Sequence, residues 1–536
     1  MPQRLIKQKL AWFLKLTNPD NQEIASLADY LTSDGFCHGF SISYGSMLVI
    51  ADKQAWWEAA LIAIAVCPYK ASALEEWITL PGADHNNAVQ LKDIFTRVLN
   101  YIVYHQASDH PSVTPFQPKH LDQLNILTKF FEFLHEGKIY KIEQLKSIAG
   151  YFSIDSLEQS LNANTIAGNI CLLQAPQHTI CLAYKDNRWI LYDPNYLHTS
   201  PYTIHRIFNT KRALAREIIQ CLGSSIGITV AAFDHTKVIG FPEFEKLLKL
   251  NTAEFIQDYG LYAMAETAPE LLPTVINSLV KNPSEDYRFA VAMMRSTPDG
   301  LNTLQMIALS SPSCLQQALQ ILARSDYGAA CFAKALQQEN SKNLLPLHTL
   351  ALSDLDTVSL ALEIASRTQE GIDAVTNSLC ILTDTHCSAF FLLGYYASKT
   401  LPTILRIADQ SNCGSISIAQ ALFLKSEKIL GLEALAYIAP QCVMKAIQIA
   451  VKGQEGLAIL ISGMYSPQGK VSGIDIIKEY IPELQRDIEE LIERRLRFFQ
   501  SEGRAPKKRG FPLTFFKMIQ SEDRDILPPS KACRRV

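Results

Sequence analysis

The distribution of apolar and polar positions over residues 1–66 predicts helices, interrupted by a turn at residues 33–36. In residues 121–135, apolar side chains recur three and four positions apart, which is the spacing of one helix face. Residues 106–119 are rich in Pro, Ser and His and are expected to form an exposed connection. Further helices are predicted over residues 86–105, 142–149 and 204–222.

Apolar runs of strand length begin after residue 168. They predict strands over residues 169–174, 178–184, 189–192 and 226–233. The short run Lys-Asp-Asn-Arg at residues 185–188 separates the second and third of these strands. The two strands are therefore expected to pair as a β-hairpin.

The second half of the chain is helical and repetitive. Similar segments start at residues 300, 343 and 386, which gives a period of 43 twice in succession, and fainter copies start at 260 and 431. A second apolar helix follows each start, for example over residues 314–323, 358–365 and 401–408. Units of this size cannot bury their apolar faces alone, so they are expected to stack into a solenoid.

One repeat contains the run Pro346-Leu347-His348-Thr349-Leu350-Ala351, which resembles the Thr-Pro-Leu-His-x-Ala signature of ankyrin repeats. Ala351 would let paired helices pack closely, and His348 would hydrogen-bond the turn, a structural role rather than a metal-binding one. Ankyrin repeats usually recur every 33 residues or so. A HEAT-like array, whose period of about 40–47 fits better, is the alternative, and a plain helical bundle is the third interpretation.

The composition limits the classes of function. With 48% hydrophobic residues, 19% charged residues and a formal charge of −3, the chain has no general attraction to nucleic acid or anionic membrane, and no nucleic-acid partner is expected. Its 536 residues suffice for two or three domains. No apolar run reaches the length of a membrane span. Residues 1–20 lack the features of a Sec-type signal peptide.

The cysteines and the other metal-ligating residue types do not show the spacing of a metal site or of a disulfide framework. Twelve cysteines occur without a Cys-x-x-Cys pair, which argues against a zinc site or a disulfide scaffold. Reduced cysteines fit a reducing compartment such as the cytosol. Glycine-rich phosphate loops, paired carboxylates and histidine clusters at metal-ligand spacing are absent from the sequence. No cofactor and no metal are expected.

Cys37 is the first candidate for chemistry. It lies where the turn at residues 33–36 opens into a helix-like stretch, and a thiol at a helix start is at the positive end of the helix dipole, which favours the thiolate. Gly35 and Gly39 flank it and would let a substrate approach the backbone. Other cysteines, such as Cys171 and Cys181, fall in apolar runs and are interpreted as small buried hydrophobes.

His178 and Asp193 are the matching candidates. His178 begins one strand of the predicted hairpin, and Asp193 opens the tripeptide Asp193-Pro194-Asn195 after the other strand. Asp193 would orient the imidazole, and the imidazole would take the proton from Cys37. Each residue also has an ordinary interpretation, as a structural histidine and a common turn. His38 is a weaker base, because adjacent side chains on a helix point about 100° apart.

The order Cys, His, Asp resembles the papain-like superfamily. The start Cys37-x-Gly-x-Ser41, and the 15 residues from His178 to Asp193, are most similar to the YopT-like cysteine peptidases, which bacteria inject into host cells. The resemblance covers roughly residues 25–235 and implies Cys37 as nucleophile, His178 as base and Asp193 as orienting acid. The chain departs from the family at Tyr44, where a Trp is usual. Ser33 and Asp34 are the sequence candidates for supporting the oxyanion.

These observations predict an α+β papain-like cysteine protease domain over residues 1–240, with a helical insertion at about 68–165. An all-α ankyrin-like or HEAT-like solenoid follows over residues 241–480, and residues 481–536 form a helix end and a basic tail. The resemblance implies an effector, injected into the host cytoplasm from the bacterial cytoplasm, with thiol-dependent peptidase or acyl-transfer activity on a host protein recruited by the repeats. The alternative is a non-catalytic effector that binds a host protein through the repeats.

The C-terminal tail is basic, with twelve Lys or Arg against four Asp or Glu from residue 494 onward. Its glycines and prolines argue against a long helix, so a solvated, largely disordered end is expected. Weak contact of the tail with anionic lipid head groups or nucleic acid is a minor alternative, and the resemblance to injected effectors implies a role as secretion signal instead.

Overall fold

The computed structural model of this chain describes residues 2–20, 22–33, 37–49, 53–81, 88–106, 131–135, 138–175, 178–195, 205–233, 240–297, 301–338, 343–426, 429–465 and 472–501. The chain divides into two compact units, Met1–Val275 and Ile276–Val536. Each unit is described separately below. The basic tail from residue 502 lies outside the described residues.

The first unit begins with helices that enclose a large apolar core. Buried residues of these helices, including Trp57, Phe40 and Phe95, form one cluster with residues of the sheet that follows. Two short strands, β1 (Trp77–Ile78) and β2 (Val89–Gln90), and the 3₁₀ turn η1 (Ala71–Glu75) lie between the fourth and fifth helices. The five helices are α1 (Pro2–Thr17), α2 (Gln22–Ser33), α3 (Cys37–Val49), α4 (Gln54–Val66) and α5 (Leu91–Gln106).

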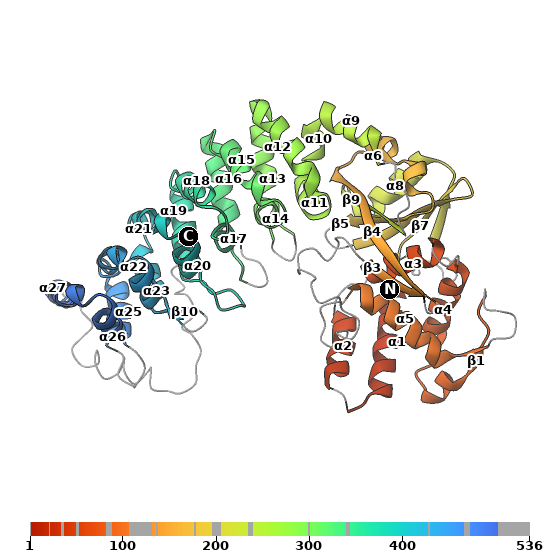
Figure 1. The fold of residues 1–536 in the computed structure, drawn as a ribbon, viewed down its shortest axis with the longest axis horizontal. Helices are drawn as coiled ribbons and strands as arrows, with labels where there is room; N and C mark the ends of the chain where they lie inside the picture. Colours follow the sequence, from red (N-terminus) through yellow and green to blue (C-terminus); the bar gives the residue numbers. More distant parts are fainter. Residues whose placement is uncertain are drawn as a thin grey trace. The chain divides into compact units, whose positions relative to one another are not determined.

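A seven-stranded antiparallel sheet forms the centre of the first unit (Figure 1). Its spatial order is β3-β4-β9-β5-β6-β7-β8, so that β9, the last strand in sequence, pairs with both β4 and β5. The strands are β3 (Phe131–His135), β4 (Lys138–Tyr151), β5 (Ile170–Ala175), β6 (His178–Lys185), β7 (Arg188–Tyr192), β8 (His205–Phe208) and β9 (Ser225–Phe233).

The predicted hairpin is confirmed. Strands β6 and β7 pair antiparallel and close on the pair Lys185–Arg188. The two residues between them, Asp186 and Asn187, both have positive φ, 50° and 59°. Two such residues make a type I′ turn, whose twist matches that of the paired strands. This turn fixes the register that places the start of β6 beside the end of β7.

Three predicted helices are wrong in whole or in part. Residues 142–149 belong to β4, and residues 131–135, the described part of the predicted helix 121–135, form β3. The segment 204–222 begins with β8 before it becomes α8 (Lys211–Leu222). The insertion expected at 68–165 is therefore not simply helical, since it supplies the long strand β4. In all three cases sheet pairing overrides a local pattern that also suits a helix.

Both faces of the sheet are covered. Ile170 and Leu172 of β5 belong to the core cluster with α3, whereas Cys171 and Leu173 alternate with them, so they point to the opposite face, and are also fully buried. Helix α8 contacts β7 and β8, and helix α11 contacts β4 and β9. The remaining helices of this unit are α6 (Ile154–Ser160), α7 (Ala163–Ile166), α9 (Pro242–Leu250), α10 (Thr252–Phe255) and α11 (Gly260–Thr267), with the 3₁₀ turn η4 (Pro269–Leu271).

The boundary between the two units lies after Val275, inside helix α12 (Leu272–Lys281), and is later than the expected boundary at residue 240. Helix α11 explains the difference. It begins at Gly260, where the sequence predicts a faint copy of the repeat, yet it packs on strands β4 and β9. The first copy of the repeat is thus part of the sheet-containing unit.

The second unit consists mainly of helices in a repeating pattern, in which the first helix of each repeat starts 42 or 43 residues after the previous one (Figure 1). Each complete repeat of this second unit contains three helices, one more than the sequence predicts. First helices are α14 (Thr303–Ser310), α17 (Pro346–Leu350), α20 (Ala389–Tyr396), α23 (Gly431–Ile438) and α26 (Gly473–Tyr480). Second helices are α12 (Leu272–Lys281), α15 (Pro312–Leu322), α18 (Leu355–Ala365), α21 (Leu401–Gln410), α24 (Val443–Ala450) and α27 (Gln485–Ser501).

Third helices are α13 (Asp286–Met293), α16 (Asp326–Leu336), α19 (Gln369–Ser378), α22 (Gly414–Phe423) and α25 (Gln454–Met464). Short elements connect them: the 3₁₀ turns η5 (Pro283–Glu285), η6 (Ser398–Thr400), η7 (Pro440–Cys442) and η8 (Pro482–Leu484), and the strands β10 (Lys425–Ser426) and β11 (Ile429–Leu430). A two-residue antiparallel pairing thus precedes α23, and isolated bridges precede α14 and α20. The ankyrin-like and HEAT-like classes both remain predictions.

A glycine recurs near the start of the third helix in four successive repeats. At each of these positions a Cβ atom would clash with a backbone carbonyl oxygen in the last turn of the second helix. Close approach of the two helices at this joint therefore requires glycine. The four positions are Gly328, Gly371, Gly414 and Gly456.

Arginine side chains form hydrogen bonds between successive repeats. Arg324 donates hydrogen bonds to the carbonyl oxygens of Leu279 and Val280 at the end of α12, and Arg367, 43 residues later, donates to the carbonyl of Ala323 after α15. The last carbonyls of a helix lack intrahelical donors and carry partial negative charge, so a guanidinium satisfies both needs.

His348 has the structural role that the sequence predicts. Its Nδ1 accepts a hydrogen bond from the N–H of Leu345 at 3.2 Å, so its Nε2–H donates to the carbonyl of Ile381 at 3.1 Å. Gln305 lies 43 residues earlier and makes the equivalent pair of bonds, with the N–H of Asn302 and the carbonyl of Leu344. His348 and Gln305 thus stabilise the equivalent turn in two successive repeats.

Candidate active site

Helix α3 lies close against the sheet and brings its first residue, Cys37, to the start of β6. Gly45 allows this approach, because a Cβ atom there would lie 2.8 Å from Cγ2 of Ile170 and 3.0 Å from Sγ of Cys181. Nearer the start of the helix, the hydroxyl of Ser41 donates to the carbonyl oxygen of Thr179 at 2.8 Å. The helix is therefore fixed to β5 and β6 at two points.

The thiol of Cys37 is nearly enclosed, with 9% of the residue exposed. The backbone N–H of Thr179 donates a hydrogen bond to its Sγ at 3.3 Å. Thr179 directly follows His178, so one strand supplies both a donor to the sulfur and the candidate base. The sequence does not single out Thr179, because its contribution comes from the backbone.

His178 and Asp193 are joined directly. Nε2 of His178 lies 2.8 Å from Oδ1 of Asp193, and both side chains are largely buried. The same carboxylate oxygen accepts the backbone N–H of Asn195 at 2.8 Å, and the side-chain amide of Asn195 lies 3.2 Å from His178 Nε2. The carboxylate of Asp193 thus closes the turn over residues 193–195 by binding the N–H of Asn195. The same carboxylate also holds the imidazole of His178.

The electrostatics favour a thiolate–imidazolium pair. Burial disfavours the charged forms of Cys37 and His178, but the hydrogen bonds within the site and the attraction between its opposite charges outweigh this effect. The pKa of Cys37 is lowered by the hydrogen bond and charge of His178 and by the N–H of Thr179. The pKa of His178 is raised to about 9 by its hydrogen bonds to Asp193 and Cys37 and by their negative charge. Since Nε2 faces Asp193, Nδ1 is the nitrogen left for the thiol.

Tyr44, where the chain departs from the YopT-like pattern, is fully buried and stacks on Tyr192. Tyr192 is the last residue of β7 and directly precedes Asp193. An aromatic contact therefore connects the helix that starts at Cys37 with the strand that leads to Asp193. The spacing of seven residues from Cys37 is the sequence signal, although it does not reveal the partner ring.

The other sequence candidates lie elsewhere. His38 is buried inside the unit, and burial lowers its pKa to about 4, so the ring is neutral near pH 7 and does not compete with His178 as a base. Ser33 is the last residue of α2, and Asp34 lies outside the described residues. The structure therefore assigns no oxyanion role to either of these two.

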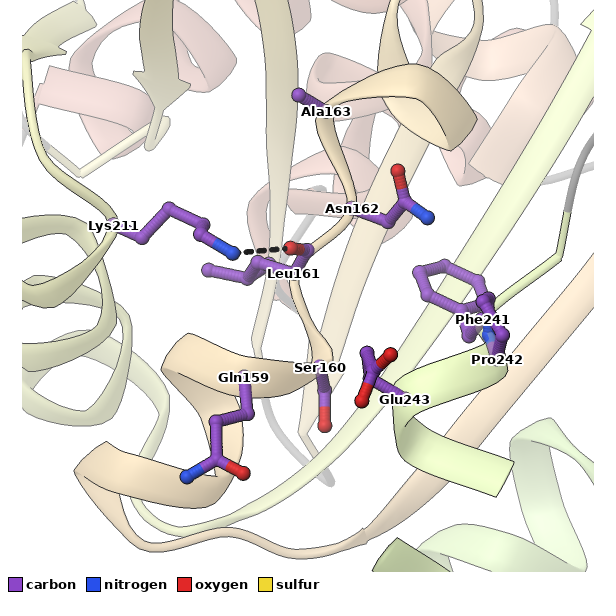
Figure 2. A pocket seen from close by; sticks show the side chains of 9 residues that line it. All are labelled: Gln159, Ser160, Leu161, Asn162, Ala163, Lys211, Phe241, Pro242 and Glu243. Atoms are coloured by element: carbon purple, nitrogen blue, oxygen red, sulfur yellow. Dashed lines mark hydrogen bonds between the residues drawn. The ribbon is translucent and has the colours of Figure 1, made fainter. Parts of the chain in front are cut away.

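A small pocket elsewhere in the first unit contains none of the three candidate residues (Figure 2). It has a volume of about 160 Å³, and in it Lys211 donates to the carbonyl oxygen of Leu161 at 3.1 Å. Within the described residues, no group of three or more His, Cys, Asp or Glu side chains could hold a metal ion. The helices of the described part are also too short or too polar to cross a membrane.

The arrangement has the parts of a nucleophilic acyl-transfer site: a sulfur at a helix start, an imidazole beside it and a carboxylate that orients the imidazole. Residues from positions 37, 178 and 193 are brought together by α3, β6 and the end of β7. Comparison of the chain with family models, with curated proteins and with solved structures finds no match.

Proposed function

We propose that the first unit is a thiol-dependent acyl-transfer enzyme, with peptide cleavage as the default reaction. The observation that carries this proposal is the placement of the Cys37 sulfur beside His178, which itself is bound to Asp193. A cysteine that served only to fill the core would need neither a charged partner nor a depressed pKa.

In the proposed reaction the thiolate of Cys37 attacks the carbonyl carbon of an amide, and a C–S bond forms. As the C–N bond breaks, Nδ1–H of the His178 imidazolium gives its proton to the leaving nitrogen. The neutral imidazole then takes a proton from water, whose oxygen attacks the thioester carbon and releases the acid and the thiolate. An amine in place of the water would give acyl transfer.

The repeats supply the recruitment part of the proposal. Large aromatic side chains of the first helices are exposed in the second unit: Tyr395 by 66%, Tyr396 by 59% and Tyr437 by 75%. Exposed aromatic residues are enriched at protein interfaces. The resemblance to injected peptidases extends the proposal to an effector that acts on a host protein in the host cytoplasm.

The same tyrosines favour a second candidate function, a binding protein whose first unit is an inactive scaffold. The variant Cys37→Ser separates the two candidates. An enzyme loses its effect and keeps its bound partner, whereas a pure binder keeps both.

The proposed chemistry is tested by alkylation of the full chain with iodoacetamide between about pH 5 and pH 9, with mass mapping of the labelled cysteines. The partly exposed Cys380 and Cys387 serve as internal reference thiols. Cys37 is expected to react faster than both below pH 7, and the advantage is expected to disappear in His178→Ala. Reaction of Cys37 no faster than the reference thiols would refute the activated thiolate.

A further inference from the structure

The pocket of Figure 2 lies where the ends of four helices of the first unit meet. Residues at the end of α6 and at the starts of α7, α8 and α9 line it. Its volume of about 160 Å³ is below the range of about 300–1,000 Å³ for pockets that hold drug-sized ligands. The pocket therefore fits a small metabolite. Because it shares no residue with the candidate triad, what it binds is independent of the proposed function.

The lining of the pocket combines buried apolar side chains with two opposite charges. Leu161 and Phe241 are 1% and 2% exposed, so the apolar part of the lining belongs to the packed interior of the unit. Lys211 of α8 and Glu243 of α9 bring an ammonium group and a carboxylate to the same cavity. Figure 2 shows these two side chains approaching the pocket from different helices.

A hydrogen bond fixes the ammonium group of Lys211 in the pocket. It donates to the carbonyl oxygen of Leu161, the residue that caps the end of α6, at 3.1 Å. An ammonium group has three N–H donors, so two remain for a ligand. Lys211 is also the first residue of α8, where a cation opposes the helix dipole. The stability of α8 alone therefore gives no reason for a lysine at this position.

The carboxylate of Glu243 is available as the acceptor. Glu243 is the second residue of α9 and is exposed. It forms no ion pair with Lys211 or with any other residue that the structure describes, although Lys211 lines the same small cavity. Two opposite charges that share a cavity without pairing leave space between them for a molecule that carries both charges.

We propose that this pocket binds a small zwitterion, an α-amino acid, whose carboxylate accepts hydrogen bonds from Lys211 and whose ammonium group donates to Glu243. The apolar side chain of such a ligand would lie against Leu161 and Phe241. An amine without a carboxylate would leave Lys211 without a ligand contact, and an acid without an amino group would do the same to Glu243. The pocket therefore discriminates by the presence of both charges.

The test is isothermal titration calorimetry of the full chain with the standard α-amino acids, one at a time. For the tightest binder, two analogues with the same carbon skeleton are then compared, one without the carboxylate and one without the amino group. Each analogue loses one charge-assisted contact, so each is expected to bind about 10- to 100-fold more weakly.

Two variants assign the contacts. In Lys211→Met the affinity is expected to fall about 10- to 100-fold, and the amino acid should lose its advantage over the analogue without the carboxylate. In Glu243→Gln, which keeps the shape of the side chain, the fall should be similar. There the advantage over the analogue without the amino group should disappear. Only direct contact of each ligand charge with its assigned side chain gives this crossed pattern.

Glu245→Gln and Lys249→Met are matched controls, because each removes an exposed charge of α9 outside the pocket. Both should leave the affinity within about twofold of the wild type. The denaturation midpoints should also stay close to that of the wild type, since all four substituted residues are exposed.

Three results would overturn the proposal. The first is that no standard amino acid binds saturably at concentrations up to about 10 mM. The second is that the two analogues bind as tightly as the amino acid. The third is an unchanged affinity in Glu243→Gln, which would leave Glu243 only its favourable position in the first turn of α9.

Discussion

The ring of Tyr44 lies parallel to the ring of Tyr192, with centroids 4.1 Å apart and 6° between the planes. Tyr44 belongs to the helix that starts at Cys37, and Tyr192 directly precedes Asp193. Both rings are fully buried. The contact thus helps to set the distance between the helix that starts at Cys37 and the turn that contains Asp193. A change in this ring pair should therefore alter the reactivity of the Cys37 thiol, although neither ring contacts the sulfur in the proposed role.

Loss of the Tyr44 ring should weaken both the fold and the site. Tyr44→Ala is expected to lower the free energy of unfolding by about 3–5 kcal/mol, the range for a deleted buried aromatic ring. It should also slow the alkylation of Cys37 at pH 7. The hydroxyl of Tyr44 has no hydrogen-bond partner within the described part of the chain, so Tyr44→Phe should be neutral or stabilising. Urea denaturation and iodoacetamide kinetics measure both; a harmful Tyr44→Phe would contradict the stacking role.

Asp193→Asn should raise the pH at which Cys37 becomes reactive. The carboxylate helps to raise the pKa of His178 to about 9, and the resulting imidazolium lowers the pKa of Cys37. With a neutral amide, the pKa of His178 falls toward 6.5, the imidazolium is lost as pH rises through that lower value, and the pKa of Cys37 rises. Alkylation at about pH 6 should drop about tenfold for each unit by which the profile moves.

The measurement is the alkylation rate of Cys37 across pH in wild type and Asp193→Asn. The low-pH limb of the profile should move to higher pH in the variant, while the rate plateau at high pH, where the thiol is ionised in both proteins, should be similar. A profile that keeps its low-pH limb would show that Asp193 does not control the charge of His178.

Gly45→Ala should be destabilising although alanine is the better helix former. The added Cβ would lie 2.8 Å from Ile170 and 3.0 Å from Cys181, so α3 must move away from the sheet, at a cost of about 1–3 kcal/mol. Gly394→Ala in α20 is the matched control, because nothing lies within 4 Å of its Cβ position. It should stabilise by about 0.5–1 kcal/mol. Thermal denaturation of both variants tests the contrast, and equal effects would reject it.

Exchange of histidine for glutamine in the repeats should be tolerated. Gln305 and His348 make equivalent bonds to a backbone N–H and to a loop carbonyl, so His348→Gln should keep most of the stability. His348→Ala loses both bonds at a buried site and should cost about 2–5 kcal/mol. Chemical denaturation distinguishes the variants, and similar losses in both would argue against a shared role.

The sequence predicts the hairpin and the candidate site residues at its two ends, because short strands and a polar turn are local signals. The strand pattern around residues 178–192 and the Asp-Asn turn lead directly to the His178–Asp193 pair. The 43-residue period likewise appears in the sequence, since the first helices recur at this spacing and the same glycine contact recurs in four repeats. Features that depend on neighbours along the chain, or on regular repetition, can therefore be predicted from the sequence alone.

Contacts between distant segments are not predictable in this way. Residues 142–149 have an apolar pattern that suits a helix, but pairing with β9 makes them a strand. Thr179 contributes a backbone N–H, which has no residue signature. The third helix of each unit has no motif in the sequence except the recurring glycine.

That glycine has a consequence for the history of the chain. Gly328, Gly371, Gly414 and Gly456 make the same joint at intervals of 42 or 43 residues. A duplication or deletion of one whole interval would leave every remaining joint with its glycine and its facing carbonyl, whereas any other length would put a side chain into a joint. The number of units can thus change by recombination in steps of one repeat, and the array can lengthen or shorten without a new solution to its packing.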